Sequence, residues 1–322
     1  MLGVLEFHAG AERHVFEVRY VREHDGVFVS DPKQKVVEFY CRHLIGLCVT
    51  YRHRREAGLC SRFATCSGTL IYVEGALYFL TAGHVLKAIH ELRTCEDVQI
   101  EDAVLADVFG WKRVSEKPIP FDLKNSHLCF IDDDELGLDF GLIPIGPHHA
   151  RLLAKNGIIA LSEINWAHQD TIKCDAYAVL GFAEEFSSER VSASGDVTVG
   201  ATMFCVRRVE PSLENQSKKT KYPRFVGRLS PKLQLKSLHG MSGGLIVGIQ
   251  YEPIHRYWVV GLQSSWDRQK GYVYGCSLPV LGSLMTKWSR EQAPILNSID
   301  DETFVITPHE IKTDGVTEHT TG

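Results

Sequence analysis

The stretch His239-Gly240-Met241-Ser242-Gly243-Gly244 decides the fold, and the apolar run Leu245–Ile249 follows it directly. Glycines around the serine permit a tight turn in which backbone N–H groups converge on one place. The apolar run has the length of a buried strand. A serine in such a turn is typical of a nucleophile beside backbone donors, and the alternative is a serine in an ordinary glycine turn.

Two further motifs precede this turn along the chain. Thr81-Ala82-Gly83-His84-Val85 closes a predicted strand, and Leu138-Asp139-Phe140-Gly141-Leu142-Ile143 opens another. Acyl transfer by serine needs a hydroxyl that attacks, an imidazole that takes its proton and a carboxylate that orients the imidazole. Ser242, His84 and Asp139 supply these groups, and the chain carries them in the order His, Asp, Ser at separations of 55 and 103 residues. A core histidine at a strand end is the alternative for His84.

In order and context, these motifs resemble those of the chymotrypsin/trypsin-like serine peptidases, over roughly Leu44 to Arg290. The resemblance implies that Ser242 is the nucleophile, His84 the general base and then acid, and Asp139 the orienting carboxylate. It also implies an oxyanion hole formed by the N–H groups of Gly240 and Ser242. We therefore expect the triad to lie in a cleft between two β-barrels.

The resemblance extends to segments that would bind the substrate. Val259–Ser264, which includes Gly261, is similar to the family strand that pairs with the substrate backbone. Ser264 then stands where the family places a serine that supports the aspartate. The stretch from Gly271 to Tyr274 is similar to the strand at the back of the specificity pocket.

Two more residues bear on the specificity that the resemblance implies. Lys236 stands six residues before the nucleophile, a position at the pocket floor in many relatives. A buried ammonium there would favour an acidic side chain at the cleaved residue, because an unpaired buried charge is costly. Trp266 stands where relatives often keep glycine at the pocket wall, so it would narrow or gate the pocket.

Two positions depart from the pattern of the family's secreted members. Val85 replaces the cysteine that usually follows the catalytic histidine, and Met241 replaces the aspartate that usually precedes the catalytic serine. Without that carboxylate no partner waits for a newly cleaved amino terminus, so we expect no activation by amino-terminal insertion. Both changes are similar to intracellular and bacterial branches of the family, such as the high-temperature-requirement proteases.

Alternating apolar and polar residues, punctuated by turn residues, predict a chain rich in strands. Helices are predicted only from Pro32 to about Arg42, at Pro147–Lys155 and from Pro279 to about Arg290. We expect an all-β fold of two six-stranded antiparallel β-barrels (chymotrypsin-like), with a carboxy-terminal helix and an amino-terminal extension. The predicted units are the extension at 1–43, a first barrel at 44–156, a second barrel with the helix at 157–298 and a loose tail at 299–322.

Composition and charge exclude several classes of protein. The chain has 322 residues, with 35 Lys+Arg against 40 Asp+Glu, and this slightly acidic balance offers no electrostatic case for binding nucleic acid. Apolar runs such as Trp258–Leu262 are far too short to cross a membrane. The amino terminus lacks a basic start followed by an apolar run, and the nine cysteines are an odd count, so we expect reduced thiols in a cytoplasmic protein.

Other clusters have ordinary interpretations. His148 and His149 suggest metal ligands, but adjacent helical residues point in different directions, and a surface helix start is favoured. The acidic run Asp132–Glu135 is interpreted as a solvated turn, and the basic run Tyr51–Arg55 as a solvated loop. Asp139-Phe140-Gly141 mimics a kinase magnesium motif without its partner motifs. We expect no metal and no organic cofactor.

The sequence predicts a serine endopeptidase that hydrolyses peptide bonds through an acyl-enzyme, with a peptide or protein as substrate. Two alternatives stay open. One is a catalytically inactive, peptidase-like scaffold that binds a peptide or protein partner, suggested by Trp266 and by the extra amino-terminal segment. The other is a latent enzyme that an activating protein partner switches on by reordering the loop around Lys236–Met241.

Overall fold

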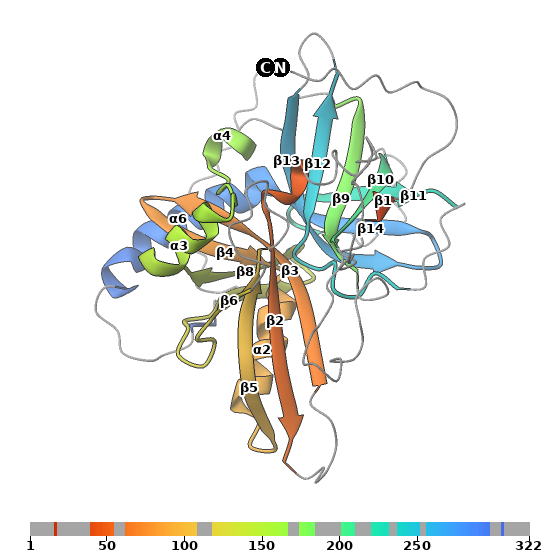
Figure 1. Cartoon of the computed structure of the whole chain (residues 1–322). Coiled ribbons are helices and arrows are strands. Elements are labelled where there is room, and N and C mark those ends of the chain that lie inside the picture. The colour runs from red at the N-terminus through yellow and green to blue at the C-terminus, as the bar shows by residue number, and fades with distance from the viewer. Residues whose placement is uncertain are drawn as a thin grey trace, which may run out of the picture.

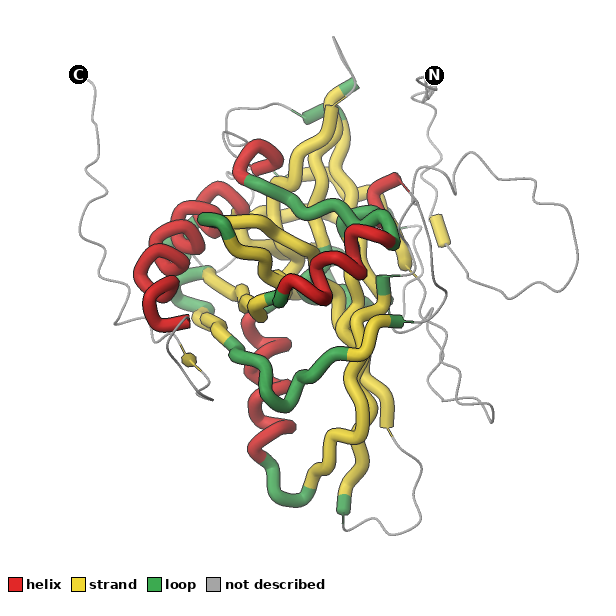
Figure 2. The backbone as a smooth tube through the Cα atoms, turned by 60° about the vertical axis from the view of Figure 1, so that its left-hand side comes forward, coloured by secondary structure: helices red, strands yellow, loops and turns green. Residues whose placement is uncertain are grey.

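The structure of this chain is a computed structural model that describes residues 16–17, 39–54, 62–107, 118–166, 174–183, 201–209, 220–231, 237–251, 256–296 and 304–305. Within these ranges the chain forms two β-sheets that pack against each other, with helices at the margins of the strand layers (Figures 1 and 2). Most of the predicted amino-terminal extension lies outside the described residues, as does most of the predicted tail.

The first sheet has the strand order β15-β7-β8-β4-β3-β2-β5-β6. Its neighbouring strands are antiparallel, except that β15 joins β7 in parallel. A cluster of buried aliphatic and aromatic side chains, among them Leu47, Phe79 and Phe130, fills one face. The strands are β2 (Leu44–His53), β3 (Arg62–Val73), β4 (Ala76–Thr81), β5 (Val98–Ala106), β6 (Ile119–Pro120), β7 (Cys129–Asp133), β8 (Leu138–Pro144) and β15 (Phe304–Val305).

The second sheet closes on itself as a six-stranded antiparallel barrel. Its order runs β9-β12-β13-β14-β11-β10, and pairing of β10 with β9 completes the circle, while the short β1 adds to β10. Val179, Phe204 and Met241 belong to the cluster that fills it. The strands are β1 (Phe16–Glu17), β9 (Ala176–Phe182), β10 (Ala201–Arg208), β11 (Arg224–Leu229), β12 (Leu245–Gln250), β13 (Arg256–Asp267) and β14 (Tyr272–Ser277).

Two of the predicted helices are present among the described residues, whereas one longer helix and one single helical turn were not predicted. Helix α3 (Pro147–Lys155) has the predicted bounds, and α6 (Leu278–Leu296) begins one residue before the predicted start. The unpredicted helix is α2 (Gly83–Thr94), whose residues Leu86 and Ile89 are buried in the core of the first sheet. A single turn, α4 (Glu163–Trp166), lies between the two sheets in the chain.

A third apolar cluster joins the two sheets and positions the site. It combines first-sheet residues such as Leu44 and Leu80 with second-sheet residues such as Phe182 and Leu262. Strands β3 and β9 approach each other here, as do β8 and β14. The predicted all-β architecture with a carboxy-terminal helix is confirmed, while the exact bounds of the predicted units stay a prediction. None of the described helices is long and apolar enough to cross a membrane.

Candidate active site

Asp139 holds His84 at two atoms. One carboxylate oxygen accepts a hydrogen bond from the His84 ring at Nδ1 (2.8 Å), and the other accepts the His84 backbone N–H (2.9 Å). Asp139 lies in β8 and is only 7% exposed, whereas His84 is the second residue of α2. The carboxylate therefore also caps α2 from a neighbouring strand, at the helix end whose dipole favours negative charge. With Nδ1 donating to Asp139, Nε2 is the nitrogen left to accept a proton.

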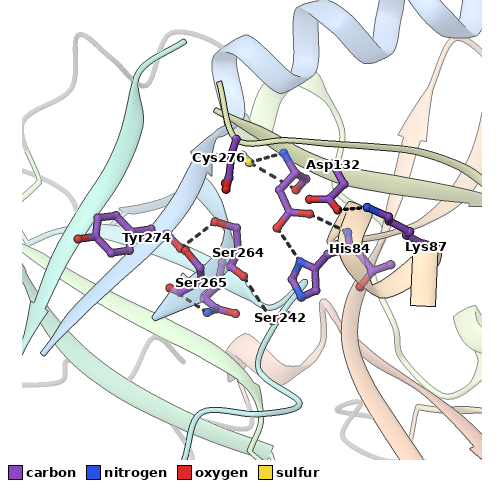
Figure 3. Close-up of polar contacts among 12 residues, drawn as sticks. His84, Lys87, Asp132, Ser242, Ser264, Ser265, Tyr274 and Cys276 are labelled. Carbon is purple, nitrogen blue, oxygen red and sulfur yellow. Dashed lines mark hydrogen bonds and ion pairs between the residues drawn. The ribbon is translucent and has the colours of Figure 1, made fainter. Parts of the chain in front are cut away.

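The electrostatics of this pair favour a basic imidazole. Burial alone would lower the pKa of His84, but the hydrogen bond and charge of Asp139 outweigh it, and the charge of Asp132 adds to them. The net effect raises the pKa of His84 above 6.5. Lys87 acts in the opposite direction, yet it is itself paired with Asp132 at 3.0 Å (Figure 3). The arrangement suits a group that must accept a proton and carry the charge briefly.

Two glycines allow the three motifs to come together. A Cβ on Gly83 would collide with the backbone of Ile131 in β7, so only glycine lets α2 begin this close to the sheet. Gly243 has φ +87°, and a Cβ there would collide with Thr81 Oγ1 and with the Ser67 carbonyl. The loop that carries Ser242 is thus packed directly against the strand that leads into His84.

The Ser242 hydroxyl contacts the Ser264 carbonyl, whereas the triad hypothesis predicts a contact with His84. Its Oγ donates to the Ser264 carbonyl at 3.4 Å, and within the described part of the chain no hydrogen bond joins it to the His84 ring. Figure 3 shows Ser242 beneath the His84 imidazole. For an active triad, the Ser242 hydroxyl would have to donate to His84 Nε2 in place of the Ser264 carbonyl.

The loop before Ser242, where the oxyanion hole is predicted, makes a tight turn at Gly240. Gly240 has φ +83°, and Met241 N–H closes the turn by donating to the Leu238 carbonyl (3.1 Å). In the described part of the chain, the N–H groups of Gly240 and Ser242 have no hydrogen-bond acceptor. Both amides of the predicted oxyanion hole are therefore available to a ligand.

Two of the predicted substrate-binding residues, Ser264 and Gly261, make contacts that differ from those predicted. Ser264 is buried beside Ser242, but the prediction that it supports Asp139 is wrong: its Oγ donates to the Tyr274 carbonyl at 3.3 Å. Gly261 is buried and paired on both sides, with Ile246 and Ser277, so it offers no free backbone edge.

Of the other predicted pocket residues, Gly271, Trp266 and Lys236, the two that lie within the described residues do not form a common pocket there. Gly271 has φ +66° in the turn between β13 and β14, not within a strand as expected, and its carbonyl accepts the Leu229 N–H. Trp266 is partly buried against the core of the second barrel, and its indole Nε1 is buried without a partner among the described residues. Lys236 lies outside the described residues, so its role stays a prediction.

The roles of three residues at the site, Cys276, Ser67 and Thr81, were not predicted from the sequence. Cys276 of β14 takes the place expected for Ser264, because its Sγ accepts the Asp139 N–H (3.1 Å). Burial first, and then the charge of Asp139, raise the pKa of this thiol to about 12, so it stays protonated. Ser67 and Thr81 contact the loop that carries Ser242 from the first sheet. Their partners are far away in sequence, and no local motif signals such contacts.

The histidine pair, the acidic run and the basic run have ordinary structural positions. Across the described ranges, no group of three or more His, Cys, Asp or Glu residues could hold a metal ion. His149 lies at the start of α3 and contacts the Pro120 carbonyl. The acidic run ends in a turn, where Asp133 accepts two backbone N–H groups. The basic run was predicted as a loop, but β2 continues to His53, and Arg52 pairs with Glu101 at 3.1 Å.

Comparisons with known proteins give structural likeness only. No family model and no curated protein matches this sequence. Among solved structures, Rv3671c of M. tuberculosis in its inactive form is 14% identical with a TM-score of 0.38, over 88% of this chain and 100% of that one. The active form of the Rv3671c protease is 15% identical with the same TM-score, over 88% of this chain and 94% of that one.

A viral structure is similar to the same degree. The serine protease domain of the Sesbania mosaic virus polyprotein is 12% identical with a TM-score of 0.38, over 75% of this chain and 91% of that chain. At these values neither similarity says what this chain does. The closed six-stranded barrel of the second sheet, the mainly antiparallel first sheet and the carboxy-terminal helix are the features that place the architecture. The fold is chymotrypsin-like.

Proposed function

We propose that this chain is a serine endopeptidase that hydrolyses peptide bonds through an acyl-enzyme. The observation that carries the proposal is the hold of Asp139 on His84, at both the ring Nδ1 and the backbone N–H. A buried carboxylate bound to Nδ1 sets the imidazole tautomer and stabilises the charged form, which is what a general base for serine needs. The amides of Gly240 and Ser242, which have no acceptor among the described residues, support the same interpretation.

The proposed reaction proceeds in two halves. Ser242 Oγ attacks the carbonyl carbon of the peptide bond while its proton passes to His84 Nε2, and the N–H groups of Gly240 and Ser242 hold the resulting oxyanion. The C–N bond then breaks, and His84 gives its proton to the leaving amine. Water attacks the ester that remains, its proton passes to His84 and then to Ser242 Oγ, and the carboxylic acid product leaves.

The substrate is a peptide or protein chain, and the free part of β13 is the proposed place for its backbone. Strand β12 pairs with β13 only as far as Leu262, and Gln263 bonds to the backbone of Gly243 and Gly244. Beyond this point β14 covers one edge of β13, and the opposite edge from Ser264 to Trp266 lies beside Ser242. An extended peptide adds to such an edge by main-chain hydrogen bonds.

A specific contact favours a second candidate, the latent enzyme. The Ser242 hydroxyl donates to the Ser264 carbonyl, and within the described residues it makes no hydrogen bond to the His84 ring. In this second candidate, a protein partner that reorders the loop around Lys236–Met241 would release Ser242 toward His84. No comparable contact favours the inactive scaffold, because Asp139 binds His84 Nδ1 as an active triad requires.

Cleavage of a peptide library by the purified chain tests the proposal. We expect turnover in the wild type and its loss in Ser242→Ala and in His84→Ala. The matched controls are Ser283→Ala, which removes an exposed hydroxyl in α6, and His149→Ala, which removes the imidazole at the start of α3. Turnover that survives in Ser242→Ala removes the proposed nucleophile. Turnover that appears only when a protein partner is added selects the latent enzyme.

A further inference from the structure

Ser67 of β3 joins three separate parts of the molecule through one side chain and its backbone. The residue has 0% exposure. Its N–H and its Oγ–H both donate to the Gly240 carbonyl, at 3.0 and 2.6 Å. The same Oγ accepts the backbone N–H of Phe182 in β9 (2.7 Å), and the Ser67 carbonyl accepts the hydroxyl of Thr81 (2.7 Å). Every polar group of this buried serine is therefore engaged.

The Gly240 carbonyl is the point at which these contacts bear on the site. It belongs to the peptide unit that lies between the N–H of Gly240 and the N–H of Ser242. Gly240 has φ +83°, a region that glycine enters freely, so the loop has other conformations within reach. Two donors on one carbonyl restrict that freedom, because a rotation of the peptide would break both bonds at once and leave the buried Ser67 hydroxyl without its acceptor.

We propose that Ser67 is a positioning residue for the oxyanion hole: its hydroxyl fixes the Gly240 carbonyl against the first sheet, so that the amides of Gly240 and Ser242 stay aimed at the reacting carbonyl. This inference rests on the proposed peptidase function. Because Oγ also accepts from Phe182, the hydroxyl ties the loop to both sheets at once. The orientation of the oxyanion hole thereby depends on how the two sheets are docked.

The variant Ser67→Ala isolates the hydroxyl. It removes one of the two donors to Gly240 and leaves the Phe182 N–H without its acceptor, while the Ser67 N–H bond remains. Loss of a whole oxyanion donor costs about 100-fold to 1,000-fold in kcat. Because Ser67→Ala only loosens the donors, we expect a fall in kcat of about tenfold, with KM changed less than about twofold. Ser67→Cys keeps a donor, although the thiol is larger and donates more weakly than the hydroxyl, so its kcat should fall between those of the wild type and Ser67→Ala. It guards against a Ser67→Ala variant that does not fold.

Thr69→Val is the matched control. Thr69 lies two residues along β3, is also fully buried, and its hydroxyl donates to the His43 carbonyl, away from the Ser242 loop. It removes a buried hydroxyl of the same strand without touching Gly240. We expect it to lower stability and to leave kcat and KM at the wild-type values.

Hydrogen exchange followed by mass spectrometry gives a second readout that does not depend on activity. In Ser67→Ala, the segment from Leu238 to Gly244 should exchange about tenfold faster than in the wild type, because its turn loses an anchor. Thr69→Val should leave this segment unchanged. Wild-type kcat or unaltered exchange in Ser67→Ala overturns the role of Ser67 while the peptidase stands. If the wild type has no turnover, the peptidase function fails, and the exchange result alone decides whether Ser67 holds the loop.

Discussion

Asp139 serves both as the partner of an imidazole and as the cap of a helix. The oxygen that binds the His84 N–H fixes where α2 begins, and the oxygen that binds Nδ1 fixes how the ring lies. Because one carboxylate does both, the position of the ring is tied to the start of the helix. The geometry of the base is thus built from backbone as well as side-chain contacts.

The charge of Asp132 on His84 leads to a pH-dependent prediction. Asp132→Asn removes a carboxylate that helps to raise the pKa of His84, and it also frees Lys87, whose charge lowers this pKa. We expect the pKa of His84, measured by NMR titration of the ring, to fall. As the imidazole acts as a base only when deprotonated, the acid limb of kcat/KM should move to lower pH by the same amount. Asp134→Asn, which removes an exposed partner of Arg224, is the control. An unmoved titration in Asp132→Asn contradicts the electrostatic reading of the pair.

Gly243 and Gly75 form a matched pair for testing close packing at the nucleophile loop. Both have positive φ, +87° and +85°, but a Cβ on Gly75 would meet nothing within 4 Å, whereas one on Gly243 would collide with Thr81 and Ser67. Each alanine variant is destabilised by the strain of a left-handed backbone conformation. Only Gly243→Ala also overpacks the site, so its unfolding free energy in urea should fall by about 2 kcal/mol more than that of Gly75→Ala. Equal losses in the two variants would mean that the loop is not packed on the first sheet.

The helices differ in how clearly their own sequence predicts them. Helix α3 was predicted with its bounds, because Pro147 begins it and Asn156-Gly157 ends it. Helix α2 was missed, because the motif around His84 was interpreted as the end of a strand. Its signal was present in the apolar spacing of Leu86 and Ile89, which face the core at helical intervals.

Strand β14 contacts β8 through a thiol, and this contact supports the next prediction. Cys276→Ala removes the acceptor of the Asp139 N–H, leaving a buried donor unpaired. Cys129→Ala in β7 removes an equally buried thiol for which the described structure has no hydrogen bond, so it measures the volume change alone. Urea unfolding should find Cys276→Ala less stable than Cys129→Ala by about 1–2 kcal/mol. If the two variants lose the same stability, the sulfur contact does not hold Asp139.

At the scale of the whole molecule, the site depends on contacts that no local pattern records. The bond from Ser67 to Gly240 spans 173 residues, and the bond from Asp139 to Cys276 spans 137. The motifs around His84, Asp139 and Ser242 were predictable because each is local. The supporting residues were not, because a serine in β3 or a cysteine in β14 becomes part of the site only when the two sheets dock.

His43 and Tyr257 connect the two sheets at a second place. His43 is buried; its Nδ1 donates to the Ile159 carbonyl (2.8 Å), and its Nε2 accepts from the Tyr257 hydroxyl (2.7 Å). Burial lowers the pKa of His43, the bond to the Ile159 carbonyl opposes this and the charge of Arg42 adds to it, and the net effect brings the pKa to about 4. The ring is therefore neutral in the folded chain.

This depressed pKa predicts a loss of stability in acid. The unfolded chain binds a proton near pH 6.5 and the folded chain only near pH 4, so the contribution of His43 is complete above pH 6.5 and falls away as pH drops toward 4. The full loss amounts to about 3 kcal/mol at most. Urea unfolding at a series of pH values should show a smaller slope between pH 6.5 and 4 in His43→Gln than in the wild type, while His149→Gln keeps the wild-type slope. An unchanged slope in His43→Gln would place the acid sensitivity elsewhere.

The most direct measurement is labelling of the purified chain with a fluorophosphonate, followed by intact mass and mapping of the modified residue. Such a reagent bonds to a serine that is activated by a base and an oxyanion hole. We expect a single label on Ser242, absent from Ser242→Ala and from His84→Ala and present in Ser283→Ala. A folded wild-type chain that takes no label, or a label that persists in Ser242→Ala, would contradict this expectation.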